Sequence, residues 1–121
     1  MPIFIVQEHH ATHLHWDFRL EINGVLKSWA VPKQPPEKSG IKRLAIQVPD
    51  HDLSYAEFEG EIPKGQYGAG KVKIWDKGNY ELEDKKPNKI VFQLHGKILK
   101  GKYVLLKLKS DKKNNWLLFK V

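Results

Sequence analysis

The residues most able to do chemistry in this chain lie close together, between Gln7 and Ile22. Four of the six histidines fall between positions 9 and 15, and an aspartate and an arginine follow at positions 17 and 19. From His15 onward polar and apolar residues alternate strictly, which is typical of a strand with one buried face. Side chains two residues apart on such a strand are roughly 6.5–7 Å apart. His15 and Asp17 can therefore share a metal ion, with Arg19 placed to bind an anion held by it.

We interpret His9, His15 and Asp17 as candidate metal ligands. Imidazole and carboxylate groups suit Mn²⁺, Fe²⁺ or Zn²⁺, and three protein ligands leave positions open for water and substrate. His13 has the same strand parity as His15 and is an alternative ligand if the strand begins earlier. The chain has no cysteine, so a thiolate zinc site and a disulfide framework are both excluded.

Arginine is rare in a chain that is otherwise rich in basic residues. Only Arg19 and Arg43 occur among 21 lysines and arginines, and the net charge of +7 favours a polyanionic partner without proving one. Lysine suffices for a positive surface, whereas the planar guanidinium grips phosphate or carboxylate with two N–H groups. His51, which follows a strand at a loop corner with Tyr55 four residues later, is a further candidate because loops often carry function. His95 ends a strand alone, and we interpret it as a satisfied or solvated side chain.

These side chains need a scaffold, and the sequence predicts one made of strands within a single domain, residues 1–121. No segment has a convincing helical pattern, and turns that contain glycine, proline or asparagine separate short apolar runs. Seven or eight short strands in 121 residues indicate an antiparallel barrel or sandwich. Nine runs are candidates for these strands: Ile3–Val6, Trp16–Ile22, Val25–Val31, Arg43–Val48, Lys71–Trp75, Tyr80–Glu83, Lys89–His95, Tyr103–Lys109 and Trp116–Val121, with Ser110–Asn115 as a loop. In the fourth run Leu44, Ile46 and Val48 are expected to point inward.

The dipeptide Asn23-Gly24 predicts a tight hairpin turn, because a type I′ turn needs positive φ at both central positions. A two-residue loop pairs Phe18 with Trp29 on the apolar face. On the polar face it pairs Asp17 with Ala30 and Arg19 with Ser28. These small partners leave room above the expected site.

Two other patterns are better explained by structure than by ligand binding. The segment from Gly65 to Val72 resembles a phosphate-binding P-loop, but Val72 replaces the Ser or Thr and a strand pattern follows in place of a helix. The acidic residues between Asp50 and Glu61 lack the order of a calcium loop. We therefore expect a glycine-rich turn and a charged surface. The N-terminus has no signal-peptide pattern and no apolar run is long enough to span a membrane, so we expect a cytoplasmic protein.

Three segments, QEHHATHLHWDFRLEINGVLKSWAVPK, KRLAIQVPDHDLSYAEFEGEIPKGQYGAGKVKIWDKG and the closing WLLFK, carry a resemblance over almost the whole chain. The sequence resembles the 3′-phosphoesterase domain of bacterial DNA ligase D and its free-standing archaeal forms. The resemblance implies an all-β fold, a compact antiparallel β-barrel of about seven or eight short strands with a polar active-site groove. It also implies a manganese-dependent enzyme that removes a 3′-phosphate, and a 3′-terminal ribonucleoside by a phosphodiesterase step, during non-homologous end joining.

By position, the resemblance makes His9, His15 and Asp17 the ligands of Mn²⁺, with Co²⁺ or Zn²⁺ as other possible metals. The phosphate-contacting and catalytic set that it implies is Arg19, Lys33, Arg43, His51 and Tyr55. His51, if protonated, contacts the phosphate or acts as general acid. The implied partners are DNA or DNA/RNA 3′ ends in a primer–template duplex, with a separate repair ligase and polymerase acting in trans.

Two departures from the family pattern affect these expectations. Ligase D domains carry basic and acidic residues before the barrel that help the diesterase step, whereas only eight residues precede His9 here. Phosphomonoesterase activity is therefore the stronger expectation. His10 and His13 occupy variable positions of the motif, so the sequence also allows a different arrangement of metal ligands.

Two other functional classes compete with this reading. The His–Asp set also matches the 2-His-1-carboxylate triad of an iron oxygenase, which predicts retained ferrous iron and oxygen-dependent turnover. A non-catalytic nucleic-acid-binding barrel needs only a basic groove and exposed aromatic residues. It predicts salt-sensitive DNA binding that survives chelation and loss of His15.

Overall fold

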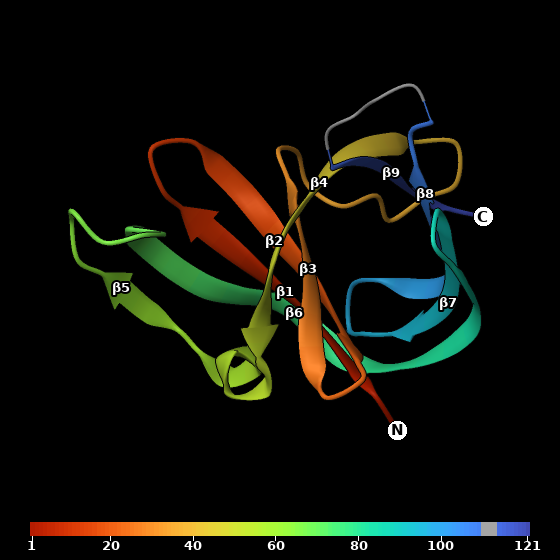
Figure 1. Ribbon diagram of the computed structural model, residues 1–121, viewed down its shortest axis with the longest axis horizontal. Helices are drawn as coiled ribbons and strands as arrows, with labels where there is room; N and C mark the ends of the chain where they lie inside the picture. The colour runs from red at the N-terminus through yellow and green to blue at the C-terminus, as the bar shows by residue number, and fades with distance from the viewer. Residues whose placement is uncertain (110–113) are drawn as a thin grey trace.

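The computed structural model describes residues 1–109 and 114–121, and these residues form an all-β chain (Figure 1). The only helix in the described ranges is one short 3₁₀ helix, η1, at Leu53–Glu57. The strands are β1 (Ile3–His10), β2 (Leu14–Ile22), β3 (Val25–Val31), β4 (Lys42–Asp52), β5 (Gly60–Ile62), β6 (Gly70–Lys86), β7 (Lys89–His95), β8 (Lys100–Lys107) and β9 (Asn115–Lys120). The predicted loop Ser110–Asn115 lies mostly outside the described residues, and Asn115 already belongs to β9.

The strands form a closed antiparallel barrel, as the sequence predicts. Eight strands follow one another in the order β1-β2-β3-β4-β9-β8-β7-β6, and β6 pairs with β1 to close the sheet. The short strand β5 is added to the start of β6. Closure satisfies the backbone hydrogen bonds of strands that an open sheet would leave at its edges.

The barrel interior holds the larger of two apolar clusters. Phe18 and Trp29, the pair expected from the hairpin, are both buried there, and the Trp29 ring meets that of Trp116 edge to face with centroids 5.7 Å apart. Each indole buries on the order of 200 Å². The interior is therefore filled by side chains, and the site must lie elsewhere.

The β2–β3 hairpin has the predicted turn and register. Asn23 has φ 52° and Gly24 has φ 80°, the positive values that a type I′ turn requires. Asp17 pairs with Ala30 and Arg19 with Ser28. Both polar side chains therefore lie on the outer face of the barrel, opposite the core.

Two expectations about strands are wrong. The fourth run points the other way: Leu44 and Ile46 are 41% and 36% exposed, whereas Ala45 is fully buried. Ala45 pairs with Trp116, so the interior has room there only for a small side chain. In addition, Lys71–Trp75 and Tyr80–Glu83 belong to one 17-residue strand. Gly78, which looks like a turn residue, lies against the carbonyl of His95, where a β-carbon would not fit.

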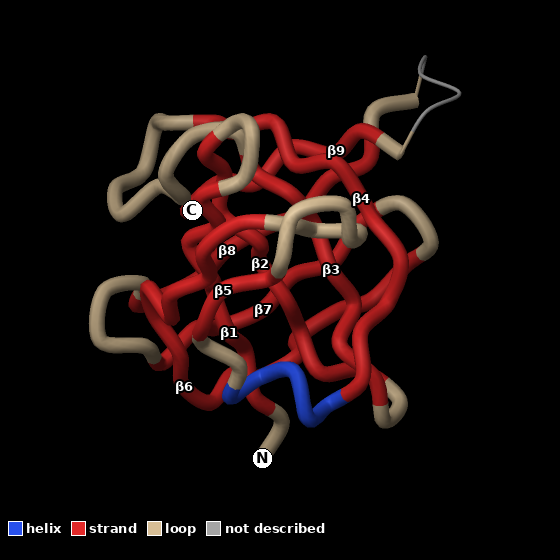
Figure 2. Tube along the Cα trace, turned by 90° about the vertical axis from the view of Figure 1, so that its left-hand side faces the viewer, coloured by secondary structure: helices blue, strands red, loops and turns tan. Residues whose placement is uncertain are grey.

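A second, smaller apolar cluster packs against the outside of the barrel and supports the site. It consists of buried Ile5, Leu26 and Ala56, the last of which lies on η1. Figure 2 shows η1 against the outside of the barrel, where it contacts β3 and β4. Ala56 of η1 therefore covers the outer face of the barrel at Ile5 of β1 and Leu26 of β3. Within residues 1–109 and 114–121, no helix has the length and apolar character that crossing a membrane would require.

Candidate metal and phosphate site

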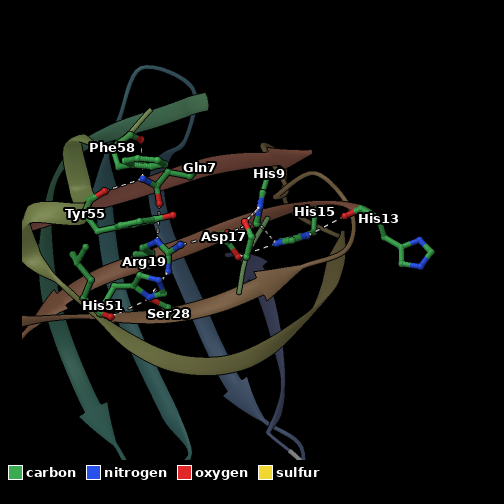
Figure 3. A network of polar contacts seen from close by, with 12 residues as sticks. Gln7, His9, His13, His15, Asp17, Arg19, Ser28, His51, Tyr55 and Phe58 are labelled. Atoms are coloured by element: carbon green, nitrogen blue, oxygen red, sulfur yellow. Dashed lines mark hydrogen bonds and ion pairs between the residues drawn. The ribbon is translucent and has the colours of Figure 1, made fainter. Parts of the chain in front are cut away.

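Three side chains from β1 and β2 point their donor atoms at a common centre (Figure 3). His9 Nδ1 lies 3.2 Å from His15 Nε2 and 3.5 Å from Asp17 Oδ2, and His15 Nε2 lies 3.2 Å from Asp17 Oδ1. The pairing of β1 with β2 sets His9 directly opposite His15. The two histidines of the predicted ligand set therefore meet across the ladder, and Asp17 joins them from the next position on the same face.

The hydrogen bonds of the outer ring nitrogens decide which atoms face this centre. His9 Nε2 lies 2.8 Å from the Gly68 carbonyl, and His15 Nδ1 lies 3.1 Å from the His13 carbonyl. Because a carbonyl only accepts, we assign the protons to these outer nitrogens. In the neutral rings, His9 Nδ1 and His15 Nε2 are then bare. Two lone pairs and a carboxylate converge without a proton between them, an arrangement that calls for a cation.

The spacing of the donors suits one metal ion. Donors held about 2.1 Å from a single ion at angles of 90–110° are about 3.0–3.4 Å apart. The observed separations of 3.2–3.5 Å are close to this range. Three donors on one side leave the remaining coordination positions facing away from the strands. His9, His15 and Asp17 therefore fit a divalent transition metal in both geometry and chemistry.

The pKa values of His15 and Asp17 depend on each other. In its protonated form His15 donates to Asp17, and this hydrogen bond raises the pKa of His15 against the effect of burial. For Asp17, burial raises the pKa, but the hydrogen bond from protonated His15 and the charge of Arg19 outweigh it, so the carboxyl pKa lies below its usual value. Asp17 is therefore a carboxylate at neutral pH, and protons compete with a metal ion chiefly at His15.

Arg19 is the centre of the polar network next to the metal ligands. Its side chain is only 3% exposed, yet it keeps charged partners: Nη2 lies 3.4 Å from Asp17 Oδ2. Nε donates to Gln7 Oε1 at 2.7 Å, and Nη1 donates to Ser28 Oγ at 2.8 Å. Burial lowers the pKa of Arg19, but a guanidinium remains charged at any physiological pH. The network fixes a positive charge beside the metal ligands.

Gln7 ties this network to the 3₁₀ helix. Its Nε2 donates to the carbonyls of Tyr55, at 2.9 Å, and Phe58, at 3.2 Å. Asp52 caps the start of the helix, because its carboxylate accepts from the backbone N–H of Ser54. Tyr55 thereby comes to lie with its ring centroid 4.9 Å from Arg19 Cζ, a cation–π contact.

His51 reaches the same network through an irregularity in the β3–β4 pairing. Ser28 pairs with Val48 but Leu26 pairs with His51, so β4 has one extra residue at this point. Arg19 Nη1 lies 3.1 Å from His51 Nδ1, and the His51 and Tyr55 rings are 4.6 Å apart. Burial and the charge of Arg19 lower the pKa of His51. In the free protein His51 is therefore neutral and accepts from Arg19.

These groups line a cavity of about 380 Å³ on the outer face of the barrel, within the usual size of a small-ligand site. One of its walls comes from the turn that resembles a P-loop. A P-loop offers backbone N–H groups to phosphate, whereas here the Gly68 carbonyl faces His9 and accepts from it. The turn therefore positions His9, a candidate metal ligand. This geometry agrees with the expectation of a glycine-rich turn in place of a P-loop.

The structure brings some predicted residues to the cavity and leaves others apart. His9, His15, Asp17, Arg19, His51 and Tyr55 line it. Lys33 and Arg43 lie together at a different hollow, with Pro32, Lys42 and Leu44, and Arg43 Nε donates to the Gln34 carbonyl. Their role in phosphate binding stays a prediction. His10 pairs with Glu8 at 2.8 Å, and His13 contributes its carbonyl.

The acidic residues near η1 have structural partners among the described residues. Asp50 pairs with Lys27 at 3.0 Å, Asp52 caps η1, and Glu59 accepts from the backbone N–H of Ile74.

Gln7 and Ser28 are residues of the site that the sequence analysis did not identify as such. The parity of Gln7 with His9 is the signal that could have identified it, because both must then point to the same face.

Comparison with known proteins agrees with this geometry. The DNA Ligase D 3′-phosphoesterase domain family matches residues 7–107. The chain is 50% identical, over 90% of its length, to the multifunctional non-homologous end joining DNA repair protein LigD of Mycobacterium tuberculosis. It is 47% identical, over 97% of its length, to the multifunctional non-homologous end joining protein LigD of Pseudomonas aeruginosa. The chain spans about 15% of the length of these two relatives. The chain belongs to the DNA ligase D 3′-phosphoesterase domain family.

Proposed function

We propose that this protein is a metal-dependent phosphoesterase that removes a 3′-phosphate from DNA ends and leaves a 3′-hydroxyl for repair synthesis and ligation. The observation that carries the proposal is the convergence of two bare imidazole nitrogens and a carboxylate beside a buried arginine. Membership of the family and the end-joining role in the relatives' names support the same conclusion.

His9, His15 and Asp17 would hold the metal, for which Mn²⁺ is the proposed ion and Co²⁺ or Zn²⁺ are other candidates. When bound, a divalent cation supplies positive charge that orients and neutralises the phosphate. The Gly68 carbonyl holds the His9 ring in the ligating tautomer.

Arg19, His51 and Tyr55 form the proposed phosphate-binding side of the cavity. Arg19 is held by partners at Nε and Nη1, so its charge is in place before substrate arrives and needs no reorganisation. A bound phosphate adds negative charge next to His51, which favours the protonated ring. In that form His51 donates to the phosphate or to the leaving oxygen as general acid.

In the proposed reaction water adds to phosphorus, the bond between phosphorus and the 3′-oxygen breaks, and a proton goes to that oxygen. The products are inorganic phosphate and a 3′-hydroxyl end. Removal of a 3′-terminal ribonucleoside by the corresponding diesterase step is the second proposed activity. The substrate is the 3′ end of a DNA or DNA/RNA strand, in a primer–template duplex, and Lys33 and Arg43 are the proposed contacts for phosphates outside the cavity.

The test is release of inorganic phosphate from a primer–template that ends in a 3′-phosphate, with Mn²⁺ and with EDTA. We expect Mn²⁺-dependent release by the wild type and loss of release in His15→Ala. His95→Ala is the matched control, because His95 is an exposed histidine that pairs with Glu81 away from the site. It should release phosphate at the wild-type rate.

Other outcomes favour other functions. Absence of release, with equal DNA binding by wild type and His15→Ala, would indicate a binding module. Oxygen-dependent turnover with retained ferrous iron would indicate the oxygenase, which uses the same donor set. The buried Arg19 beside the donors indicates an anionic ligand next to the proposed metal, as the phosphoesterase requires.

A further inference from the structure

The cavity has an apolar part that the proposed phosphate chemistry does not use. His9, His15, Asp17, Arg19 and His51 form its polar end. The remaining walls are mostly apolar and come from Ala11, Ala30, Val48, Ile62 and Tyr67. A phosphate and its metal need only the polar end. The apolar walls therefore indicate that a second, less polar part of the substrate lies in the same cavity.

Tyr67 is the most exposed of these wall residues, with 85% of its surface open to solvent. A single exposed aromatic residue is ordinary on a protein surface. This one, however, lines the same cavity as Arg19 and His51. Its ring therefore stands at the rim of the cavity, within range of the phosphate-binding side.

The turn that carries Tyr67 is closed by its own hydrogen bonds and joined to the barrel after the tyrosine. Within the turn, the N–H of Gln66 donates to the Pro63 carbonyl at 3.3 Å, and the N–H of Ala69 donates to the Gln66 carbonyl at 3.1 Å. The Gly68 carbonyl then accepts from His9. Gly70 lies so close to the backbone of His10 that a β-carbon would overlap it. The backbone that carries Tyr67 is thus held at a fixed place relative to His9.

We propose that Tyr67 stacks on the 3′-terminal nucleobase of the strand whose phosphate occupies the polar end of the cavity. The inference rests on the proposed function, which supplies the phosphate. A tyrosine ring offers a flat apolar face at low conformational cost, and stacking on it is tolerant of sequence because every base has a π face. The protein would then require a terminal base without preferring one base strongly.

The test compares two primer–template duplexes whose primers both end in a 3′-phosphate and whose template is abasic opposite the last primer position. One primer carries a terminal base and the other an abasic tetrahydrofuran in its place, so only the stacked group differs. For the wild type we expect kcat/KM to be about 5- to 100-fold higher with the base, the range that one base–aromatic stack gives. Tyr67→Ala should lose this advantage, mainly through KM, and should match the wild type on the abasic substrate. Tyr67→Phe should behave as wild type on both.

Gln66→Ala is the control for disturbance of the turn, because Gln66 is exposed in the same turn and its backbone bonds remain. Equal kcat/KM of the wild type on the two substrates would overturn the inference. So would an equal loss on both substrates in Tyr67→Ala, which would place Tyr67 in support of His9. A loss in Tyr67→Phe would assign the role to the hydroxyl and also overturn it.

A binding measurement without metal separates this inference from the proposed function. An oligonucleotide with 3′-terminal 2-aminopurine followed by a phosphate reports stacking as a loss of fluorescence. Quenching by the wild type and Tyr67→Phe but not by Tyr67→Ala would support the inference, even if no phosphate is released. Phosphate release without any quenching would overturn it and leave the proposed function standing.

Discussion

Replacement of Gln7 by methionine tests whether one buried amide holds the two sides of the site together. The side chain is fully buried and of similar length to methionine, so the change removes hydrogen bonds and little volume. It leaves the Arg19 Nε–H and the Phe58 carbonyl without this partner, whereas the Tyr55 carbonyl still accepts from the N–H of Phe58. Each buried group left unpaired costs about 1–3 kcal/mol, with the charged donor at the upper end. We expect the free energy of unfolding to fall by about 3–4 kcal/mol.

Gln7→Met should lower both stability and activity, and each is measured by its own assay. In urea denaturation at pH 7.5 the midpoint should fall, and an accompanying fall of roughly 10–15 °C in Tm is expected for a domain of this size. In the phosphate-release assay kcat/KM should fall about 10- to 100-fold, because a displacement of Arg19 by about 1 Å is enough for that effect. A stability within 0.5 kcal/mol of the wild type would refute the reasoning.

Gln7→Glu separates the two roles of the amide. Its carboxylate still accepts from Arg19 but cannot donate to the two carbonyls of the η1 segment. We expect a stability loss similar to that of Gln7→Met with a smaller loss of activity. Gln93→Met, on β7 and away from the cavity, is the matched control. An equal loss in this control would show that the effect comes from glutamine-to-methionine exchange in general.

Three further outcomes follow from the site and the core. Mn²⁺ at 100 times its dissociation constant should raise the free energy of unfolding by about 2.7 kcal/mol, seen as a higher Tm that EDTA reverses and that His15→Ala abolishes. Because Asp17 raises the pKa of His15, protons should compete with Mn²⁺ up to pH values above 6.5. Mn²⁺ affinity should therefore rise with pH through this region, and titrations that give one affinity from pH 5.5 to 8 would contradict this. Burial raises the pKa of Tyr80 and Tyr103 to about 12. Since the native state holds both neutral, their contribution is present below pH 10 and lost as the pH rises to about 12, by roughly 2 kcal/mol each. Urea midpoints at pH 8 and 11 measure the first part of this loss, about 1.4 kcal/mol for each tyrosine, and Tyr103→Phe should remove its share of the difference.

The parts of the fold that depend on local chemistry could be predicted from the sequence. The Asn23-Gly24 turn fixes its own loop length, and the register of Asp17 and Arg19 against β3 follows from that length. The face of β4 could not be predicted in the same way. Leu44 and Ile46 look like core residues, and only the pairing of Ala45 with Trp116 shows why they are outside.

The residues of the site also differ in whether the sequence could predict them. The proposed metal ligands share one short segment. Strand parity places His15 and Asp17 on one face, and the pairing of β1 with β2 adds His9. His51 joins through an extra residue in β4, which alternation does not show, and its candidacy came from its place at a loop corner. Gln7 looks like any polar strand residue until the carbonyls of Tyr55 and Phe58 are placed above it.

The closeness of the metal ligands along the chain bears on the order in which the site forms. His9 and His15 lie on β1 and β2, two adjacent strands joined by a three-residue connection, so bringing them together closes only a short loop. His51 must wait until β4 has paired with β3, more than thirty positions later in the chain. Contacts of short sequence separation form early in folding. We expect the nascent hairpin to capture a divalent ion before the phosphate-binding side exists. The metal carried by the mature protein would then reflect the ions available during synthesis, with the tighter-binding late transition metals favoured over manganese.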